Sequence, residues 1–382
     1  MPRILEWKNS EDPRDIVHVT VQSLVEGKLV AVPAETAYHV LASGLNPTAV
    51  EHLTKLPGRA PDRSPCVFLR SSHEAIDYSP KMSMIASRIA HRGWPGPLVL
   101  QLPACDPTSL THQLPAAVRD ALIVDKRFLS QRVAAHQAIS QAMRLLPGPL
   151  VAAPLVDAAG NAACNRQQVE ALAGKGLAII VDDGPTHFGG FATAVRIDQN
   201  HCTVTSPGVL DQSALTRLGQ LTVLLVCTGN TCRSPMAEAI LRRLMAERFA
   251  GQFAEGQPPP AIAVSAGLSA FPGGPASAEA ISVMKQKGLS LVHHQSRAVS
   301  DRLIMQADLV LTMTKSHRNA IVQRWPELSS KTHLLSNNNG DVSDPFGGSE
   351  SVYAACAVQI EQYLRGWVDQ IEEEWFPVWH VS

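Results

Sequence analysis

The stretch LTVLLVCTGNTCRSPMAEAI, residues 221–240, joins an apolar run to a short polar loop and the start of a helix. Residues 221–227 are almost all apolar or β-branched, which predicts a buried strand that ends at Cys227. Pro235 is typical of a first helical turn, where its missing N–H is not needed. Residues 228–233 therefore form a loop between a strand and a helix. In a parallel sheet, this is the edge at which ligands bind.

The chemistry of this loop predicts an anion site. Backbone N–H groups and the helix dipole at a helix N-terminus favour phosphate, and the same field favours a thiolate at Cys227. Arg233 can offer two parallel N–H donors to phosphate oxygens, and Ser234 can donate a hydrogen bond to the sulfur. The arrangement predicts that the Cys227 sulfur attacks phosphorus and forms a phosphocysteine.

The rest of the chain reads as two α/β halves. After residue 221, strands and helices alternate, which predicts a parallel sheet with right-handed crossovers. We expect an N-terminal domain over 1–210, a linker over 211–220 and a C-terminal domain over 221–382. The strands predicted in the first half are 28–40, 64–70, 96–103 and 176–183, with helices at 81–92 and 130–145. In the second half the predicted strands are 221–227, 261–267, 307–314 and 332–336, with helices at 235–249, 276–287, 316–325 and about 350–373.

Composition indicates an ordinary globular protein. Of the 382 residues, 45% are hydrophobic and 18% are charged, which is unlike a disordered chain. The net charge of −1 gives no global basic footprint for nucleic acid or an anionic membrane. The beginning of the sequence has no apolar signal-peptide core. The seven cysteines are scattered, so we expect neither a disulfide framework nor a metal site, and a reducing cytoplasm fits best. We expect no cofactor.

Residues 221 to about 375 resemble the low-molecular-weight protein-tyrosine-phosphatase family. Besides CTGNTCRSPMAEA, the resemblance includes VSAGL (264–268), HQSRAV (294–299), ADLVLTMT (307–314) and DPFGGS (344–349). It implies a doubly wound four-stranded parallel sheet flanked by helices. It also implies that Cys227 is the nucleophile, that Arg233 binds phosphate and that Asp344 is the general acid. The phosphate-binding loop implied by the resemblance consists of Thr228, Gly229, Asn230, Thr231, Cys232 and Ser234.

Two positions bear on the substrate, a phosphorylated protein. Tyrosine phosphatases of this family usually carry an aliphatic residue where this chain has Thr231, and often a Tyr pair where it has Phe346-Gly347. CTGNTCRSPMAEA with DPFGGS is instead similar to the protein-arginine-phosphatase branch. A small hydroxyl leaves room for a planar guanidinium near phosphorus. We therefore expect a phosphoarginine substrate, and phosphotyrosine stays open as the alternative. Cys232 is either a small buried thiol or the partner of Cys227 in a reversible disulfide.

Residues of about 12–210 resemble the threonylcarbamoyl-AMP synthase family, with its YrdC-like twisted α/β fold. The similar segments, in the order of the family, lie at 29–53, WPGPLVLQL (94–102), RVAAH (132–136), APLVDAAG (153–160) and GGFATAV (189–195). The family's Lys-x-Arg becomes Pro57-Gly-Arg59, its Ser-Ala-Asn becomes Leu155-Val156-Asp157, and its Ser-Thr-Val becomes Ala192-Thr193-Ala194. Ala34 and His39 replace a usual Thr and Gly.

These departures remove groups that would bind ATP and its pyrophosphate. Pro57 brings no cation, and the Asp157 carboxylate repels polyphosphate. We expect a catalytically degenerate domain. A ligand pocket is predicted from the retained side chains of Glu35, Thr36, Tyr38, Arg59, Arg132 and Thr193. The open alternatives are a still-active ATP-dependent synthase and a module that binds RNA or a nucleotide.

Overall fold

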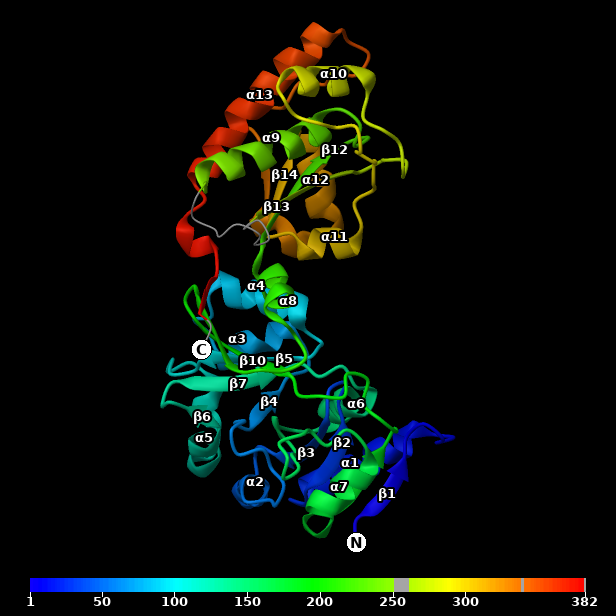
Figure 1. Ribbon diagram of the computed structural model, residues 1–382, viewed down its shortest axis with the longest axis vertical. Coiled ribbons are helices and arrows are strands. Elements are labelled where there is room, and N and C mark those ends of the chain that lie inside the picture. The colour runs from blue at the N-terminus through cyan, green and yellow to red at the C-terminus, as the bar shows by residue number, and fades with distance from the viewer. Residues whose placement is uncertain (251–260, 338–339, 381–382) are drawn as a thin grey trace. The chain divides into compact units, whose positions relative to one another are not determined.

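The computed structural model describes residues 1–250, 261–337 and 340–380. The chain forms two compact units (Figure 1). The N-terminal unit holds Met1–Leu218 together with the segment from Pro377 onward, and the C-terminal unit holds Gly219–Phe376. Among the residues described, none of the helices combines the length and the hydrophobicity that crossing a membrane requires.

The C-terminal unit is a four-stranded parallel sheet in the order β13-β12-β14-β15, as the sequence predicts. Its strands are β12 (Leu221–Cys227), β13 (Ala261–Gly267), β14 (Leu309–Thr312) and β15 (Thr332–Leu334). Its helices are α9 (Arg233–Arg248), α10 (Ala278–Gln286), α11 (Asp301–Gln306), α12 (Lys315–Arg324) and α13 (Glu350–Asp369).

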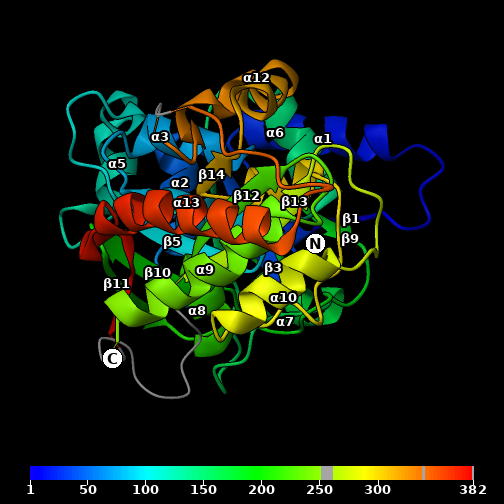
Figure 2. The same cartoon turned by 90° about the horizontal axis from the view of Figure 1, so that it is seen from above.

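Helices cover both faces of this sheet. Along β12, Val223 and Leu225 pack toward α9, α10 and α13, whereas Leu224 and Val226 pack toward α11 and α12. This alternation follows from the two-residue period of a strand, and it explains why β12 is apolar on both sides. Figure 2 shows α13, α9 and α10 together in one layer. The sheet is thus buried except at its edges and ends, and Cys227 lies at a carboxyl end.

The N-terminal unit is built on a twisted mixed sheet. Its twelve described strands include the path β1-β9-β2-β3-β8-β4-β7-β5-β10-β11-β16, with β6 beside β7. The strands are β1 (Arg3–Glu6), β2 (Val30–Pro33), β3 (Tyr38–Ser43), β4 (Cys66–Phe68), β5 (Leu98–Pro103), β6 (Ile123–Val124), β7 (Phe128–Arg132), β8 (Leu150–Pro154), β9 (Ile179–Asp182), β10 (Thr193–Asp198), β11 (His201–Ser206) and β16 (Val378–His380).

Two separate apolar cores flank this sheet. Helices α1 and α6 pack on one face, and α2, α4, α5, α7 and α8 contribute to the core on the other. The helices are α1 (Pro13–Val25), α2 (Pro47–Thr54), α3 (Ala75–Tyr78), α4 (Met84–Gly93), α5 (Ala116–Leu122), α6 (Gln137–Leu145), α7 (Arg166–Ala173) and α8 (Gln212–Gly219). Short 3₁₀ turns lie at Ser72–Glu74, Leu110–Gln113, Gly174–Gly176, Pro326–Lys331 and Glu373–Trp375.

Two element predictions in the first half are wrong. The apolar stretch 28–40 is not one strand, because it contains β2, a turn and the beginning of the antiparallel strand β3. The stretch 130–145 is not one helix, since its first residues end strand β7 and α6 begins only at Gln137. A short apolar run can form either a strand or a helix, and the segments that it pairs with in the fold decide which one forms.

Two segments differ from the predicted domain plan. Most of the predicted linker 211–220 is helix α8, which the Asp211 side chain caps by accepting a hydrogen bond from the Ala214 N–H at 2.7 Å. Leu215 anchors this helix in the core of the N-terminal unit. The strand β16, predicted as part of the second domain, pairs in parallel with β11 and belongs to the N-terminal unit.

Candidate active site

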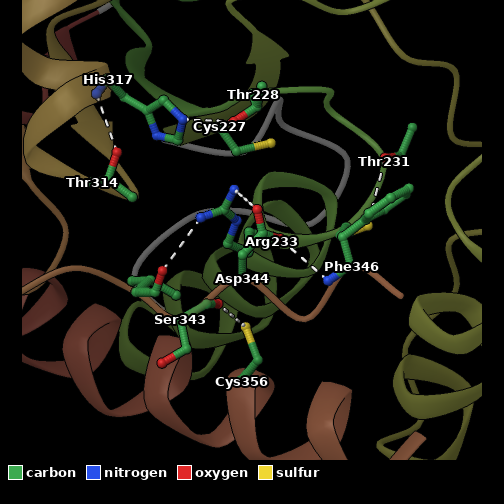
Figure 3. Close-up of polar contacts among 12 residues, drawn as sticks. Cys227, Thr228, Thr231, Arg233, Thr314, His317, Ser343, Asp344, Phe346 and Cys356 are labelled. Atoms are coloured by element: carbon green, nitrogen blue, oxygen red, sulfur yellow. Dashed lines mark hydrogen bonds and ion pairs between the residues drawn. The ribbon is translucent and has the colours of Figure 1, made fainter. Parts of the chain in front are cut away.

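Strand β12 delivers Cys227 to the carboxyl edge of the sheet, and helix α9 begins six residues later at Arg233. Between them the loop curls against Gly267, the residue that pairs with Cys227 on strand β13. A Cβ at Gly267 would lie 2.5 Å from the Thr228 carbonyl oxygen and 2.9 Å from the Asn230 nitrogen. Glycine is therefore required here for the loop to approach the strand. Figure 3 shows the resulting cluster of side chains.

The Cys227 sulfur is held by two polar groups of the loop. Its Sγ lies 2.9 Å from the Ser234 hydroxyl, and it accepts a hydrogen bond from the Asn230 backbone N–H at 3.2 Å. The side chain is 3% exposed. Hydrogen bonds that a sulfur accepts favour its negative charge, so the geometry suits a thiolate nucleophile.

Asn230 keeps the loop in shape. Its backbone has φ of +56°, a left-handed conformation that Asn tolerates better than most residues. Its side-chain amide donates to Ser234 Oγ and Ser265 Oγ, both at 2.9 Å, and its amide oxygen accepts from the Arg297 backbone N–H at 2.8 Å. Its carbonyl oxygen lies 2.8 Å from His294 Nε2. One fully buried side chain thus ties the loop to three neighbouring segments.

Arg233 and Asp344 meet at the site although 111 residues separate them. The Arg233 guanidinium is buried, and it donates to Asp344 Oδ2 at 2.6 Å and to the Val342 carbonyl at 3.3 Å. The Asp344 side chain is 53% exposed, so the ion pair sits at the rim of the loop. The structure therefore brings together the three side chains predicted to be catalytic.

The other residues of the predicted loop lie around this centre. The Thr231 hydroxyl is 3.5 Å from the Cys232 sulfur, which in turn lies 3.2 Å from the Tyr353 hydroxyl. Burial raises the pKa of Tyr353 to about 12, so its hydroxyl keeps its proton. Phe346 lies two residues after Asp344 and is 78% exposed. All seven cysteines of the chain are free thiols.

His317 is a site residue that the sequence analysis missed. It lies on α12, and its Nε2 is 2.9 Å from the hydroxyl of Thr228. Burial, followed by the positive charge of Arg233, lowers the pKa of His317 to about 4. A single His in a polar helix, 89 residues from its partner, carries no sequence signal. The contact forms because α12 packs against β14.

In the N-terminal unit, three of the six predicted pocket residues come together. Arg132 is fully buried and donates to Glu35 Oε1 at 2.6 Å and to Thr36 Oγ1 at 2.9 Å. Its Nη1 lies 3.3 Å from His39 Nε2, and burial lowers the pKa of His39 to about 3. The guanidinium is thus satisfied within the protein.

The other three predicted pocket residues hold backbone segments instead. The Tyr38 hydroxyl donates to the Gly184 carbonyl at 2.9 Å. The Arg59 guanidinium donates to the carbonyls of Thr54, Ala60 and Arg63. Thr193 exchanges hydrogen bonds with the backbone of Leu210. These contacts support a fold-maintaining role for Tyr38, Arg59 and Thr193, and a ligand pocket formed by all six residues stays a prediction.

One of the cavities on this sheet is narrow. It measures about 30 Å³, and Arg132 is the member of the predicted set that lines it, together with His39 and Arg63. A volume of this size holds on the order of one water molecule. His39 stands where the family usually has Gly, and its imidazole occupies space at the wall. Among the residues described, no group of three or more His, Cys, Asp or Glu has a geometry that could hold a metal ion.

Comparison with known proteins gives a family for each half. Residues 222–376 match the family described as low molecular weight phosphotyrosine protein phosphatase. Residues 22–208 match the Sua5, YciO and YrdC family, described as telomere recombination.

Curated relatives align with the second half of the chain. It is 38% identical over 157 residues to the protein-arginine-phosphatase of Geobacillus stearothermophilus, covering 40% of this chain and 97% of that protein. It is 35% identical over 156 residues to the protein-arginine-phosphatase of Bacillus subtilis, with the same coverage. It is also 35% identical over 154 residues to the low molecular weight protein-tyrosine-phosphatase Wzb of Escherichia coli K12, covering 40% of this chain and 96% of Wzb.

The two matched segments are consecutive and together take up most of the chain. The resemblances seen in the sequence are therefore confirmed at the level of the family. This chain belongs to the low molecular weight phosphotyrosine protein phosphatase family, and it carries that phosphatase domain behind a YrdC-like one.

Proposed function

We propose that this phosphatase acts through a phosphocysteine at Cys227 and that its substrate is phosphoarginine in a protein. The observation that carries the proposal is the contact geometry of the sulfur, which two hydrogen-bonding groups fix at the start of α9. The other thiol of the loop, Cys232, contacts the Tyr353 hydroxyl at 3.2 Å instead.

The first chemical step transfers the phosphoryl group to sulfur. The phosphate oxygens bind the loop N–H groups and the Arg233 guanidinium, so they must displace the Asp344 carboxylate from it. The Cys227 thiolate attacks phosphorus, an S–P bond forms and the bond from phosphorus to the leaving group breaks. Once freed from Arg233, the Asp344 carboxylate takes up a proton from solvent at the exposed rim and donates it to the departing nitrogen.

The second step restores the enzyme. Asp344, now ionised, accepts a proton from a water molecule that attacks the phosphorus of the phosphocysteine. The S–P bond breaks, inorganic phosphate leaves and the thiolate returns to its hydrogen bonds with Ser234 and Asn230. Neither step requires a metal ion or an organic cofactor.

The preference for arginine rests on Thr231 and on two relatives. The small polar Thr231 leaves space beside the phosphate loop, and both relatives named protein-arginine-phosphatase align with this half of the chain. The alternative substrate is phosphotyrosine, which the name of the similarly close Wzb supports.

The test of the mechanism is Cys227→Ser. We expect a loss of kcat of at least about 1,000-fold and no trapped ³²P-labelled phosphoenzyme, because a serine hydroxyl is a far weaker nucleophile at neutral pH. Cys105→Ser is the matched control, since Cys105 is an exposed thiol of the N-terminal unit and should keep full activity. Substantial turnover by Cys227→Ser would remove Cys227 from this role.

For the YrdC-like domain we propose a loss of the synthase reaction. The internally satisfied Arg132 and the cavity of about 30 Å³ support this proposal. Binding of RNA or a nucleotide by this domain stays a prediction. Retention of labelled RNA by the full chain on nitrocellulose would test it.

A further inference from the structure

Thr228 is placed to read the substrate. It directly follows the nucleophile and is exposed, whereas Cys227 before it is buried. Its hydroxyl lies 2.9 Å from Nε2 of His317, a side chain that is only 7% exposed. Figure 3 shows the His317 ring on one side of the Cys227 side chain and Thr231 on the other. An exposed hydroxyl beside the nucleophile is thus fixed from behind by a buried ring.

The ring that holds this hydroxyl is neutral. Burial and the nearby charge of Arg233 lower the pKa of His317 to about 4, although the carboxylates of Asp341 and Asp344 act in the opposite direction. A neutral imidazole has one N–H and one acceptor nitrogen. Its other nitrogen, Nδ1, is buried and has no hydrogen-bond partner within the part of the chain that the structure describes.

The hydrogen-bond count at Thr228 leaves an acceptor facing outward. A hydroxyl has one donor and two lone pairs. If the Thr228 hydroxyl donates to His317 Nε2, both lone pairs of Oγ1 stay free. If Nε2 carries the proton and donates, one lone pair stays free. In either tautomer Oγ1 can accept a hydrogen bond from a substrate.

We propose that the Thr228–His317 pair is a specificity determinant, in which Oγ1 of Thr228 accepts an N–H of the substrate guanidinium while His317 fixes the hydroxyl. His317 is a positioning residue here, and Thr228 makes the contact. This inference rests on the proposed function. In it, Thr228 provides a second polar side of the substrate site, opposite Thr231.

The chemistry distinguishes the two candidate substrates. A guanidinium next to phosphorus carries several N–H donors and no acceptor, so it matches an outward-facing lone pair. The aryl ring of phosphotyrosine has no N–H, and it would cover the Thr228 hydroxyl without satisfying it. A site built to hydrogen-bond one substrate rejects an analogue that lacks the partner group.

The direct test is Thr228→Val in the full chain. Valine keeps the shape of threonine but removes the hydroxyl. We measure kcat/KM for a phosphoarginine peptide and for the same peptide with phosphotyrosine. The ratio of the two values should fall about tenfold toward tyrosine, the size expected for one hydrogen bond to a charged group. Thr228→Ser, which keeps the hydroxyl, should retain most of the wild-type ratio.

The role of His317 needs its own readout. His317→Phe should shift the ratio in the same direction, and it should add little in the Thr228→Val background, because His317 acts through that hydroxyl. His317→Gln, whose amide can still meet the hydroxyl, should rescue part of the ratio. If His317 had a purely structural role, His317→Phe would lower kcat/KM equally for both peptides, in the wild-type and in the Thr228→Val background.

The outcomes separate this inference from the proposed function. A wild-type protein without activity on phosphoarginine overturns the proposed substrate and this inference together. A wild-type protein with that activity, whose ratio moves less than twofold in a folded Thr228→Val variant, overturns only the inference. A folded state is established from an unchanged melting temperature, and His317→Phe supplies the same comparison if Thr228→Val unfolds.

Discussion

At the scale of single residues, the site is a set of short-range contacts made by a loop on itself. Cys227, Asn230 and Ser234 lie within eight residues, and each touches another of the three. Because the contacting residues are close together in the sequence, the motif CTGNTCRS is enough to predict these contacts. Asp344 was predicted because of the family resemblance, whereas the bare sequence Asp-Pro reads only as a turn.

Thr231→Ile tests the residue that the sequence assigns to substrate choice. Isoleucine adds apolar volume beside the loop without touching Cys227 or Arg233. We expect the kcat/KM ratio to move about ten- to thirtyfold from phosphoarginine toward phosphotyrosine, since packing an aromatic ring is worth about 1–2 kcal/mol. The assay compares the same two peptides. An equal loss of kcat/KM on both peptides would indicate only that the loop is damaged.

Asp344→Asn tests proton donation. An amide keeps the shape of the side chain but cannot give a proton, so cleavage should slow about 100-fold or more for substrates with poor leaving groups. For 4-nitrophenyl phosphate, whose leaving group needs little protonation, the loss should be much smaller. The measurement is kcat for both substrates at one pH. Equal losses of kcat on both substrates would indicate that Asp344 positions Arg233 and does not donate a proton. The contact between the two side chains makes this the main alternative explanation.

At the scale of elements, the catalytic loop depends on the strand beside it. Gly267 ends β13 at the level of Cys227, and its missing side chain makes room for the Thr228 carbonyl. The sequence predicted the boundaries of β12 and β13 correctly because both are apolar and end at a clear change of composition. It failed at 28–40, where a four-residue turn inside an apolar stretch gives no such change.

Gly267→Ala should damage the loop without changing its chemistry. The added Cβ would meet backbone atoms at 2.5 and 2.9 Å, and backbone cannot move aside as a flexible side chain can. We expect kcat/KM to fall at least about tenfold on both peptides and the free energy of unfolding to fall by about 1–3 kcal/mol. Urea unfolding and the two-peptide assay measure these effects.

Gly366→Ala is the matched control for this variant. Gly366 lies within α13, and nothing comes within 4 Å of a Cβ placed there. Alanine should stabilise the helix by about 0.5–1 kcal/mol and leave both activities unchanged. Wild-type activity in Gly267→Ala would show that the loop tolerates the displacement.

At the scale of the whole molecule, the two halves differ in how well their sites are preserved. The phosphatase half keeps the residues of its loop and their contacts, whereas the YrdC-like half has Pro57, Leu155 and Asp157 where the family it resembles has Lys, Ser and Asn. Asp157, for example, accepts hydrogen bonds from the Ala159 and Asn161 backbone N–H groups of its own turn. The fold of each half was predictable from ordered motifs, but the contacts of His39 and Arg132 were not, because they depend on where these two side chains point.

The full chain should make no threonylcarbamoyl-AMP from ATP, threonine and bicarbonate. The family's lysine is replaced by Pro57, and Glu35 and Thr36 already occupy the Arg132 guanidinium, so the groups that would bind the ATP phosphates are missing or engaged. Mass spectrometry of the reaction mixture, with an active synthase of the family as the positive control, checks the prediction. Product above the level of a no-enzyme blank would show that the pocket opens and that the domain is still catalytic.

The central claim is that the Cys227 loop removes phosphate from arginine in proteins. The most direct measurement is kcat/KM of the wild-type chain for two peptides that differ only in carrying phosphoarginine or phosphotyrosine. The value for phosphoarginine is predicted to be higher by at least about tenfold, with both activities lost in Cys227→Ser. A higher value for phosphotyrosine would contradict the claim and make this chain a tyrosine phosphatase.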